Sequence, residues 1–136
     1  MKKVLFLCTG NSCRSQMAEA IVNARMGGEW QAFSAGTKPA GYVHPRALDA
    51  LSEIGIRHEG RSKRADEFRE VDFDLVVTVC DSAAEECPVW LGKGKRAHHD
   101  FPDPAKAEGT EEEVMNIFRA VRDNIEKVIL EILKEA

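Results

Sequence analysis

The feature that most constrains the fold of this chain is a short apolar segment that leads directly into a loop of small polar residues. Residues 3–7 (KVLFL) have the apolar pattern of a strand that is buried on both faces. Residues 9–14 (TGNSCR) have no strand pattern, and from Ser15 onward apolar residues return at helical spacing. A strand, a tight loop and a helix in this order predict the opening unit of an α/β fold.

The rest of the chain continues this alternation. We expect further strands over residues 30–35, 73–79 and 95–99, and helices from Ser15 to Gly27, from Pro45 to Gly55, over residues 61–69, and from Thr110 onward. Thr110 and Glu113 form a capping box at the start of the last helix. Strands that alternate with helices predict a three-layer, doubly wound α/β fold. It would hold a four-stranded parallel sheet flanked by helices, with the loop after strand 1 at the carboxyl edge of the sheet.

Ligands in such folds bind beyond the carboxyl ends of the strands. The loop after the first strand begins at Cys8, and the segment 73–79 ends directly before Cys80. Because both strands are parallel members of one sheet, these two ends share one rim. The topology therefore predicts that Cys8 and Cys80 lie near each other.

Length and composition describe an ordinary globular chain. The 136 residues suit one domain, 1–136, and the hydrophobic fraction of 43% is typical. The net charge of -4 gives no reason to expect a nucleic acid or an anionic membrane as a partner. The apolar run after Lys3 is too short for a signal peptide, and no run reaches the length of a membrane helix. We therefore expect a soluble, cytoplasmic protein, and we expect it to be a monomer.

The loop itself has the residues of an oxyanion site with its own nucleophile. Backbone N–H groups between a strand and a helix can surround an anion, and Gly10 and Asn11 are residue types that tolerate left-handed backbone angles. Arg14 can hold two oxygens at once, and the same positive field would make a thiolate available at Cys8. Ser15 could donate a hydrogen bond to that sulfur. The expected oxyanion-binding residues are Thr9, Gly10, Asn11, Ser12, Cys13, Arg14 and Ser15.

The alternative is a buried cysteine beside a surface arginine, with no catalytic role. For a lone cysteine that alternative would be preferred. The spacing Cys-x5-Arg, with Gly, Asn and Ser between the two residues at a strand-to-helix turn, favours the catalytic interpretation.

Residues 6–19 (FLCTGNSCRSQMAE) resemble the phosphate loop of the low-molecular-weight tyrosine phosphatase fold, and more narrowly that of the thioredoxin-coupled arsenate reductases built on it. The likeness covers nearly the whole chain, because residues 33–36 (FSAG), 74–80 (DLVVTVC), 87–88 (CP) and 103–104 (DP) match in the same order. The phosphate loop is common to both families. Cys80 and Cys87 are what distinguish the reductases.

The resemblance implies a relay of three cysteines. Cys8 would attack arsenate, Cys80 would expel arsenite by forming a disulfide with Cys8, and Cys87 would then attack Cys80. The final disulfide would pass to thioredoxin or a similar dithiol reductant. Cys13 has no evident role in this scheme, and we expect it to be structural. If residues 80–87 were helical, the Cα atoms of Cys80 and Cys87 would lie roughly 10 Å apart, whereas a disulfide tolerates about 7 Å, so we expect a redox-dependent conformational change there.

The resemblance also assigns supporting roles. Asp103, in a proline-rich loop, would be the general acid, with Asp100 as the alternative, although either residue could simply belong to a turn. The positions of Asn11, Glu19 and Ser34 surround a potassium ion in some relatives. Lys63 stands where a further carboxylate is expected, which suggests that the lysine supplies the positive charge itself.

Other functions remain to be weighed. A zinc site would need Cys80, Cys87, His98 and His99, but their spacing is not that of zinc motifs, and we expect neither a metal nor a cofactor. A tyrosine phosphatase would use the same loop, but its pocket usually has aromatic walls and this chain has one tyrosine, Tyr42. A non-catalytic module that senses oxyanions or redox state is the third possibility. Arsenate or phosphate is the expected ligand in each case that uses the loop.

Overall fold

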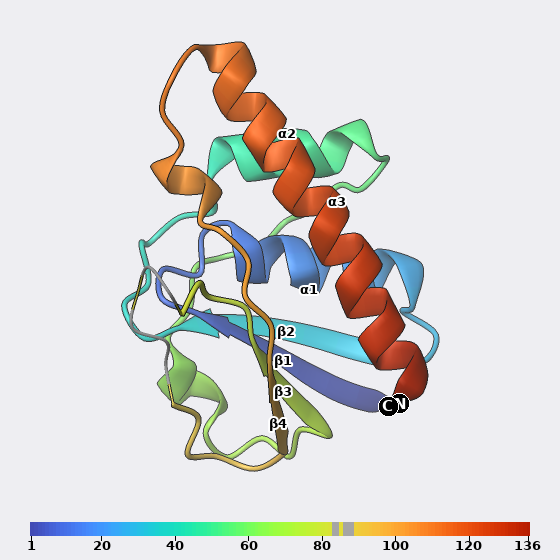
Figure 1. Ribbon diagram of the computed structural model, residues 1–136. Helices are drawn as coiled ribbons and strands as arrows, with labels where there is room; N and C mark the ends of the chain where they lie inside the picture. The colour runs from blue at the N-terminus through green and yellow to red at the C-terminus, as the bar shows by residue number, and fades with distance from the viewer. Residues whose placement is uncertain (83–84, 86–88) are drawn as a thin grey trace.

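A computed structural model describes residues 1–82, 85 and 89–136. The sheet consists of the parallel strands β1 (Lys2–Cys8), β2 (Trp30–Gly36), β3 (Leu75–Thr78) and β4 (Lys95–His98). Their order across the sheet is β2-β1-β3-β4, which places β1 in the interior (Figure 1). The predicted fold class, a four-stranded parallel sheet with flanking helices, is confirmed.

The described residues also form three α-helices and two short 3₁₀ helices: α1 (Arg14–Arg25) between β1 and β2, α2 (Pro45–Glu53) and η1 (Ala65–Phe68) between β2 and β3, and η2 (Pro104–Lys106) and α3 (Glu111–Glu135) after β4. The helix predicted over residues 61–69 is therefore wrong except for the single turn of η1. The backbone there is used by other elements, because Lys63 accepts a hydrogen bond from the Gly36 amide and Arg64 forms a β-bridge with Gly36.

Side chains cap the first turns of α2 and α3 by accepting hydrogen bonds from backbone N–H groups. His44 precedes α2, and its ring Nδ1 accepts the Arg46 amide at 3.1 Å. Thr110 and Glu113 form the predicted capping box of α3, with side-chain to backbone distances of 3.1 and 3.2 Å. Helix α1 is different, because Cys13 precedes it and makes no side-chain cap. Some of its first N–H groups thus remain available to a bound ligand.

The two faces of the sheet are covered in different ways. The three α-helices pack on one face, where they enclose a core that includes Phe6, Met17 and Phe118 (Figure 1). On the other face η1 and irregular segments cover a smaller cluster of aromatic rings. Its members are Phe33, Phe68, Phe73 and Trp90, with ring centroids between 5.6 and 6.2 Å apart. Together these layers bury both faces of β1.

The strand register places the cysteines as expected. Cys8 is the last paired residue of β1 and lies beside Gly36 of β2. On the other side Leu7 pairs with Thr78, and the Val79 amide donates to the Leu7 carbonyl at 2.8 Å. Cys80 follows directly, at the same carboxyl edge of the sheet as Cys8. The shared rim predicted from the topology is confirmed.

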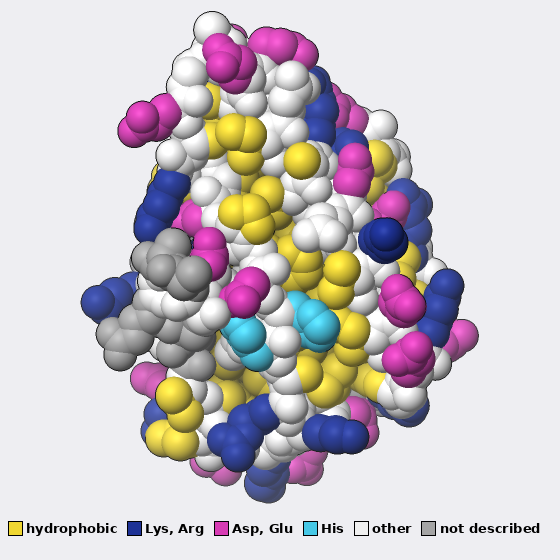
Figure 2. Space-filling view, in the orientation of Figure 1, with side chains coloured by type: hydrophobic (Ala, Val, Ile, Leu, Met, Phe, Trp, Pro, Cys, Tyr) yellow, Lys and Arg dark blue, Asp and Glu magenta, His cyan; other side chains and the backbone are white. Residues whose placement is uncertain are grey.

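The molecular surface shows no large area of one charge on the visible face, because acidic and basic side chains are interspersed there (Figure 2). The two ends of the chain meet, and the Lys2 ammonium donates to the Ala136 carbonyl at 2.7 Å (Figure 1). Within the described part of the chain, no helix has the length and apolar character needed to span a membrane.

Gly36 is the point at which β2 supports the loop after β1. A methyl group at this position would overlap the Thr9 carbonyl oxygen. We expect Gly36→Ala to lower the free energy of unfolding by about 1–3 kcal/mol, the usual cost of overpacking, when measured by urea denaturation. Gly28→Ala is the matched control, because a methyl group there would meet no atom within 4 Å. Equal stability of the two variants would contradict this account.

Candidate active site

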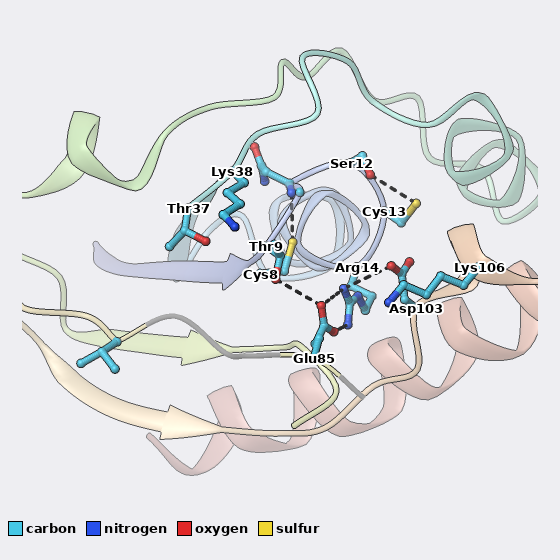
Figure 3. Close-up of a pocket in the computed structure, with 13 residues that line it drawn as sticks. Cys8, Thr9, Ser12, Cys13, Arg14, Thr37, Lys38, Glu85, Asp103 and Lys106 are labelled. Atoms are coloured by element: carbon cyan, nitrogen blue, oxygen red, sulfur yellow. Dashed lines mark hydrogen bonds and ion pairs between the residues drawn. The ribbon is translucent and has the colours of Figure 1, made fainter. Parts of the chain in front are cut away.

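The loop after β1 closes around the sulfur of Cys8 (Figure 3). Cys8 Sγ accepts the Asn11 amide at 3.1 Å and lies 2.9 Å from Ser15 Oγ. Ser15 Oγ accepts a hydrogen bond from Asn11 Nδ2 at 2.8 Å, and its own hydrogen is free to point at the sulfur. When Ser15 donates, both contacts on Cys8 come from donors, which is the arrangement that stabilises a thiolate.

Asn11 holds the loop in shape from within. It is fully buried and has a φ angle of 48°, the left-handed conformation that asparagine tolerates better than most residues. Its Oδ1 accepts the Gln16 side-chain amide at 3.0 Å and the Lys63 backbone amide at 2.8 Å. Of the two residues expected to permit this backbone angle, Asn11 adopts it and Gly10 does not.

Below the loop a buried lysine, Lys63, lies beside Glu19 and Ser34. Lys63 is 8% exposed, and its Nζ donates to the Arg61 carbonyl at 2.7 Å. The same nitrogen lies 3.7 Å from Glu19 Oε1, which also accepts the Ser34 hydroxyl at 3.0 Å. Burial lowers the pKa of Lys63, and the Glu19 carboxylate opposes that change. The ammonium group of Lys63 thus provides a positive charge beside Glu19 and Ser34.

A histidine that sequence reasoning missed completes this layer. His58 Nε2 lies 2.7 Å from Gln16 Oε1. Since Oε1 is an acceptor, the ring nitrogen must carry the hydrogen. Burial lowers the pKa of His58, although Glu19 lies 3.7 Å away, so the ring is neutral near pH 7. No motif surrounds His58 in the sequence that would have indicated this contact.

Arg14 is the cation of the site, and its side chain is 4% exposed. Its Nη1 donates to the Phe101 carbonyl at 3.2 Å, and its Nη2 lies 3.6 Å from Asp103 Oδ2. Both nitrogens also donate to the carboxylate of Glu85. Burial alone would lower the pKa of Arg14, but the hydrogen bonds to Glu85, together with Cys8 and Asp103, raise it. The guanidinium group is permanently charged.

These groups line one cavity of about 620 Å³. Its walls include predicted site residues and others that the sequence did not single out: Cys8, Thr9, Gly10, Asn11, Ser12, Cys13, Arg14, Thr37, Lys38, Glu85, Val89, Asp103 and Lys106. Figure 3 shows Lys38 and Lys106 coming from opposite sides of the loop. Both lysines add positive charge to a cavity that suits an anion.

The two candidate acids lie in different surroundings. Asp103 is part of the cavity wall, and its Oδ1 accepts the Ala105 amide at 3.0 Å. Asp100 instead bonds His98 at 2.7 Å and the Ser82 hydroxyl at 2.7 Å. Hydrogen bonds from the Ser82 amide and hydroxyl and from His98 hold the pKa of Asp100 at about 2. Asp100 is therefore a poor proton donor near pH 7, and the geometry favours Asp103.

The cysteines differ in environment. Cys8 and Cys13 are free thiols, and burial raises the pKa of Cys13 to about 12. Cys80 is fully buried two residues beyond the end of β3 and is disulfide-bonded in this structure, and Cys87 lies outside the described residues. No group of three or more metal-ligating side chains occurs in the described ranges, and His98 bonds Thr78 and Asp100 instead.

Comparisons with known proteins agree with this geometry. The model of the family described as low molecular weight phosphotyrosine protein phosphatase matches residues 3–136. An arsenate reductase of Halalkalibacterium halodurans is 50% identical over 129 residues, which cover 94% of this chain and 92% of the relative.

Two solved structures extend the comparison. The arsenate reductase from Archaeoglobus fulgidus has a TM-score of 0.70 and 33% identity, covering 93% of this chain and 98% of that one. A thioredoxin-dependent arsenate reductase of Corynebacterium glutamicum has a TM-score of 0.66 and 26% identity, covering 100% of this chain and 64% of that one.

With its strand, loop and helix arranged around Cys8 and Arg14, this chain belongs to the low molecular weight phosphotyrosine protein phosphatase family. Within that family, its similarity to proteins named arsenate reductases is high over nearly all of its length. The resemblance recognised in the sequence is confirmed.

The difference between Cys8 and Cys13 can be tested by alkylation. Because the pKa of Cys13 is about 12, that residue is a protonated thiol at pH 7.5. We expect iodoacetamide to modify Cys8 and leave Cys13 unmodified, as mapped by mass spectrometry, and inorganic phosphate to protect Cys8. Unfolded protein is the control, in which every cysteine should react. Modification of Cys13 at the rate of Cys8 would refute the assignment.

The role of Lys63 can be tested by melting in different salts. We expect the wild-type protein to have the same melting temperature in KCl and NaCl. Lys63→Ala should lose about 3 kcal/mol of stability, because the Glu19 side chain, 13% exposed, would be left without its cation. Potassium should restore part of that loss. Lys95→Ala, on the exposed side of β4, is the control. A large potassium-specific rise for the wild-type protein would count against a lysine that replaces the ion.

Proposed function

We propose that this protein reduces arsenate to arsenite with Cys8, Cys80 and Cys87, and that thioredoxin or a similar dithiol restores it. The observation that carries the proposal is the position of Cys80. It follows β3 at the same edge of the sheet as Cys8, in a chain that is similar to arsenate reductases over nearly its whole length. A phosphatase of the same fold needs only the first cysteine.

Binding of the oxyanion uses the loop and Arg14. The backbone N–H groups of residues 9–15 and the start of α1 supply positive potential, and the fork of Arg14 matches two oxygens of a tetrahedral anion. Lys38 and Lys106 add charge at the cavity wall. Thr9, Gly10, Ser12 and Cys13 contribute mainly through their backbone in this scheme.

The first chemical step forms a bond between sulfur and arsenic. The Cys8 thiolate, held by Asn11 and Ser15, attacks the arsenic atom of arsenate, and one oxygen leaves. Asp103 donates a proton to that oxygen, which departs as water. Arsenic remains in its higher oxidation state, +5, in this adduct.

The second step transfers the electrons. The Cys80 thiolate attacks Cys8 Sγ and forms a disulfide, and the electron pair of the sulfur–arsenic bond remains with arsenic, which leaves as arsenite. Cys87 then attacks Cys80 and frees the Cys8 thiolate. Two thiols have thus been oxidised to one disulfide for each arsenate reduced, and a dithiol reductant must reverse that oxidation.

Movement of the Cys80 segment is part of this proposal. Cys80 is 0% exposed and disulfide-bonded in this structure, so that disulfide must be reduced before its sulfur can attack Cys8. The predicted distance between Cys80 and Cys87 cannot be compared with the structure, because Cys87 lies outside the described residues. The expected redox-dependent change therefore stays a prediction.

A phosphatase activity is the second candidate, and the family itself favours it. The contacts that hold arsenate would hold phosphate equally well, and water could hydrolyse a phosphocysteine at Cys8. The exposed Tyr42 is not part of the cavity wall, so the cavity offers no aromatic wall from tyrosine to a phosphotyrosine. We infer a weak activity on small phosphoesters beside the reduction of arsenate.

We further propose that residues 1–136 act as one domain, as a monomer in the cytoplasm. The similarity to a reductase described as thioredoxin-dependent supports the choice of reductant. The net charge of -4, together with the interspersed charges on the face drawn in Figure 2, supports the proposal that neither a nucleic acid nor a membrane is a partner.

The relay is tested in a single turnover. Arsenate is added to fully reduced protein without an external reductant, arsenite is quantified, and disulfides are mapped by mass spectrometry. We expect one arsenite per chain and a disulfide between Cys80 and Cys87. An absence of arsenite together with unoxidised thiols would overturn the proposal, and hydrolysis of a phosphoester by the same sample would then favour the phosphatase.

Variants separate the steps of the relay. Cys87→Ser should still release one arsenite but stop at a disulfide between Cys8 and Cys80, whereas Cys80→Ser should release none. Cys13→Ser is the matched control, since Cys13 shares the loop with Cys8 but is protonated near pH 7, and it should behave as the wild-type protein.

A further inference from the structure

The carboxylate of Glu85 forms an ion pair with Arg14 in the oxyanion site. Glu85 Oε2 accepts Arg14 Nη2 at 3.2 Å and the Thr9 hydroxyl at 3.1 Å. Its other oxygen pairs with Arg14 Nη1 and accepts the Asp81 amide at 2.7 Å. Figure 3 shows the side chain reaching into the cavity toward Arg14. Both carboxylate oxygens are thus engaged on the cavity side.

The contact is strongly charged and largely withdrawn from water. The side chains of Arg14 and Glu85 are 4% and 12% exposed. Burial would raise the pKa of Glu85, but hydrogen bonds from Arg14 and the Asp81 amide outweigh it and hold that pKa at about 2. Glu85 is therefore ionised over the whole physiological pH range. It presents Arg14 with two anionic oxygens, as a bound oxyanion would.

Arg14 cannot serve both anions with the same donors. One hydrogen of Nη1 is directed to the Phe101 carbonyl, and Nη2 lies near Asp103. The paired donors that suit two oxygens are those now used by Glu85. A dianion in the cavity would also face the negative charge of Glu85 at close range.

We propose that Glu85 is an internal competitor for the oxyanion site, and that arsenate or phosphate must displace its carboxylate from Arg14 in order to bind. This inference rests on the proposed use of Arg14 as the oxyanion clamp. It makes Glu85 a residue that sets the affinity of the site without taking part in the chemistry.

Displacement of Glu85 also affects the turn next to Cys80. The Asp81 amide, one residue after Cys80, donates to the same carboxylate and loses this acceptor when Glu85 leaves. Ser82 remains attached to Asp100 through two hydrogen bonds of 2.9 and 2.7 Å. Oxyanion binding therefore removes one hydrogen bond from the turn that follows Cys80, which is disulfide-bonded in this structure. By linkage, the factor by which a bound oxyanion weakens the contact between Glu85 and Arg14 is also the factor by which that contact weakens oxyanion binding.

The test is the affinity of the full-length protein for inorganic phosphate, measured by isothermal titration calorimetry with the disulfide of Cys80 intact, as in the structure. Glu85→Gln removes the charge and keeps the shape, and we expect it to bind phosphate about tenfold more tightly than the wild-type protein. Glu53→Gln is the matched control. Glu53 also has a pKa of about 2 because of two arginines, Arg119 and Arg122, but it is not part of the cavity wall. Its substitution should leave phosphate affinity unchanged.

Thermal melting provides a second readout. Without phosphate, Glu85→Gln should be less stable than the wild-type protein, because Arg14 has lost its partner, and saturating phosphate should raise its melting temperature more. If Glu85→Gln does not fold, Glu85→Asp serves instead, since the shorter side chain reaches Arg14 less well, and it should also bind phosphate more tightly.

Unchanged or weaker phosphate affinity in both variants would overturn the inference. Weaker affinity would mean that Glu85 positions Arg14 for the ligand. Because phosphate binding requires neither Cys80 nor Cys87, this result is independent of the single-turnover test with arsenate. A failure of the relay and a failure of the competitor are therefore distinguishable.

Discussion

The hydrogen bonds of one buried asparagine hold the site together. Asn11 donates its amide to Cys8, donates its side chain to Ser15, and accepts from Gln16 and from the Lys63 backbone. These contacts join β1, α1 and the segment before η1 in a place from which water is excluded. Loss of the side chain would leave several buried polar groups without partners, and each such group costs about 1–3 kcal/mol. The shape of the loop, the orientation of Ser15 and the position of Lys63 all depend on this residue.

Two ion pairs lie on opposite sides of that loop and have different consequences. The pair of Lys63 and Glu19 lies below it, where the lysine neutralises a partly buried carboxylate with a positive charge supplied by the chain itself. The pair of Arg14 and Glu85 lies within the cavity, where a ligand can exchange with one partner. The first pair stabilises the fold, whereas in the second the Glu85 carboxylate and a bound oxyanion compete for Arg14.

Much of this arrangement could be predicted from the sequence because its signals are local. Strands β1 and β3 follow from short apolar runs, whereas β4 (KRAH) has none. Helix α3 follows from a long apolar stripe with a capping box, and the role of Cys8, Arg14 and Ser15 follows from their spacing in one loop. The expected helix over residues 61–69 was wrong, since its polar composition suits a helix but its backbone is bound to Gly36 and Asn11. Contacts with distant segments determine the backbone conformation of residues 61–69, and such contacts cannot be predicted from the periodicity of the sequence.

Glu85 and His58 were missed for the same reason. Glu85 is one of several acidic residues in a polar segment, and its meaning comes only from the approach of Arg14, which lies 71 residues earlier. His58 is isolated in the sequence and acquires a role through Gln16, 42 residues away.

The high pKa of Cys13 has a consequence for the choice of electron donor. With a pKa of about 12, the fraction of Cys13 present as thiolate at pH 7 is roughly 10⁻⁵, and only the thiolate attacks sulfur. Cys13 lies in the same loop as Cys8, yet it is chemically silent toward an adduct on Cys8. A loop with two cysteines thereby keeps one of them out of thiol chemistry, and in the proposed relay the oxidation passes instead to Cys80, which lies beyond the end of β3.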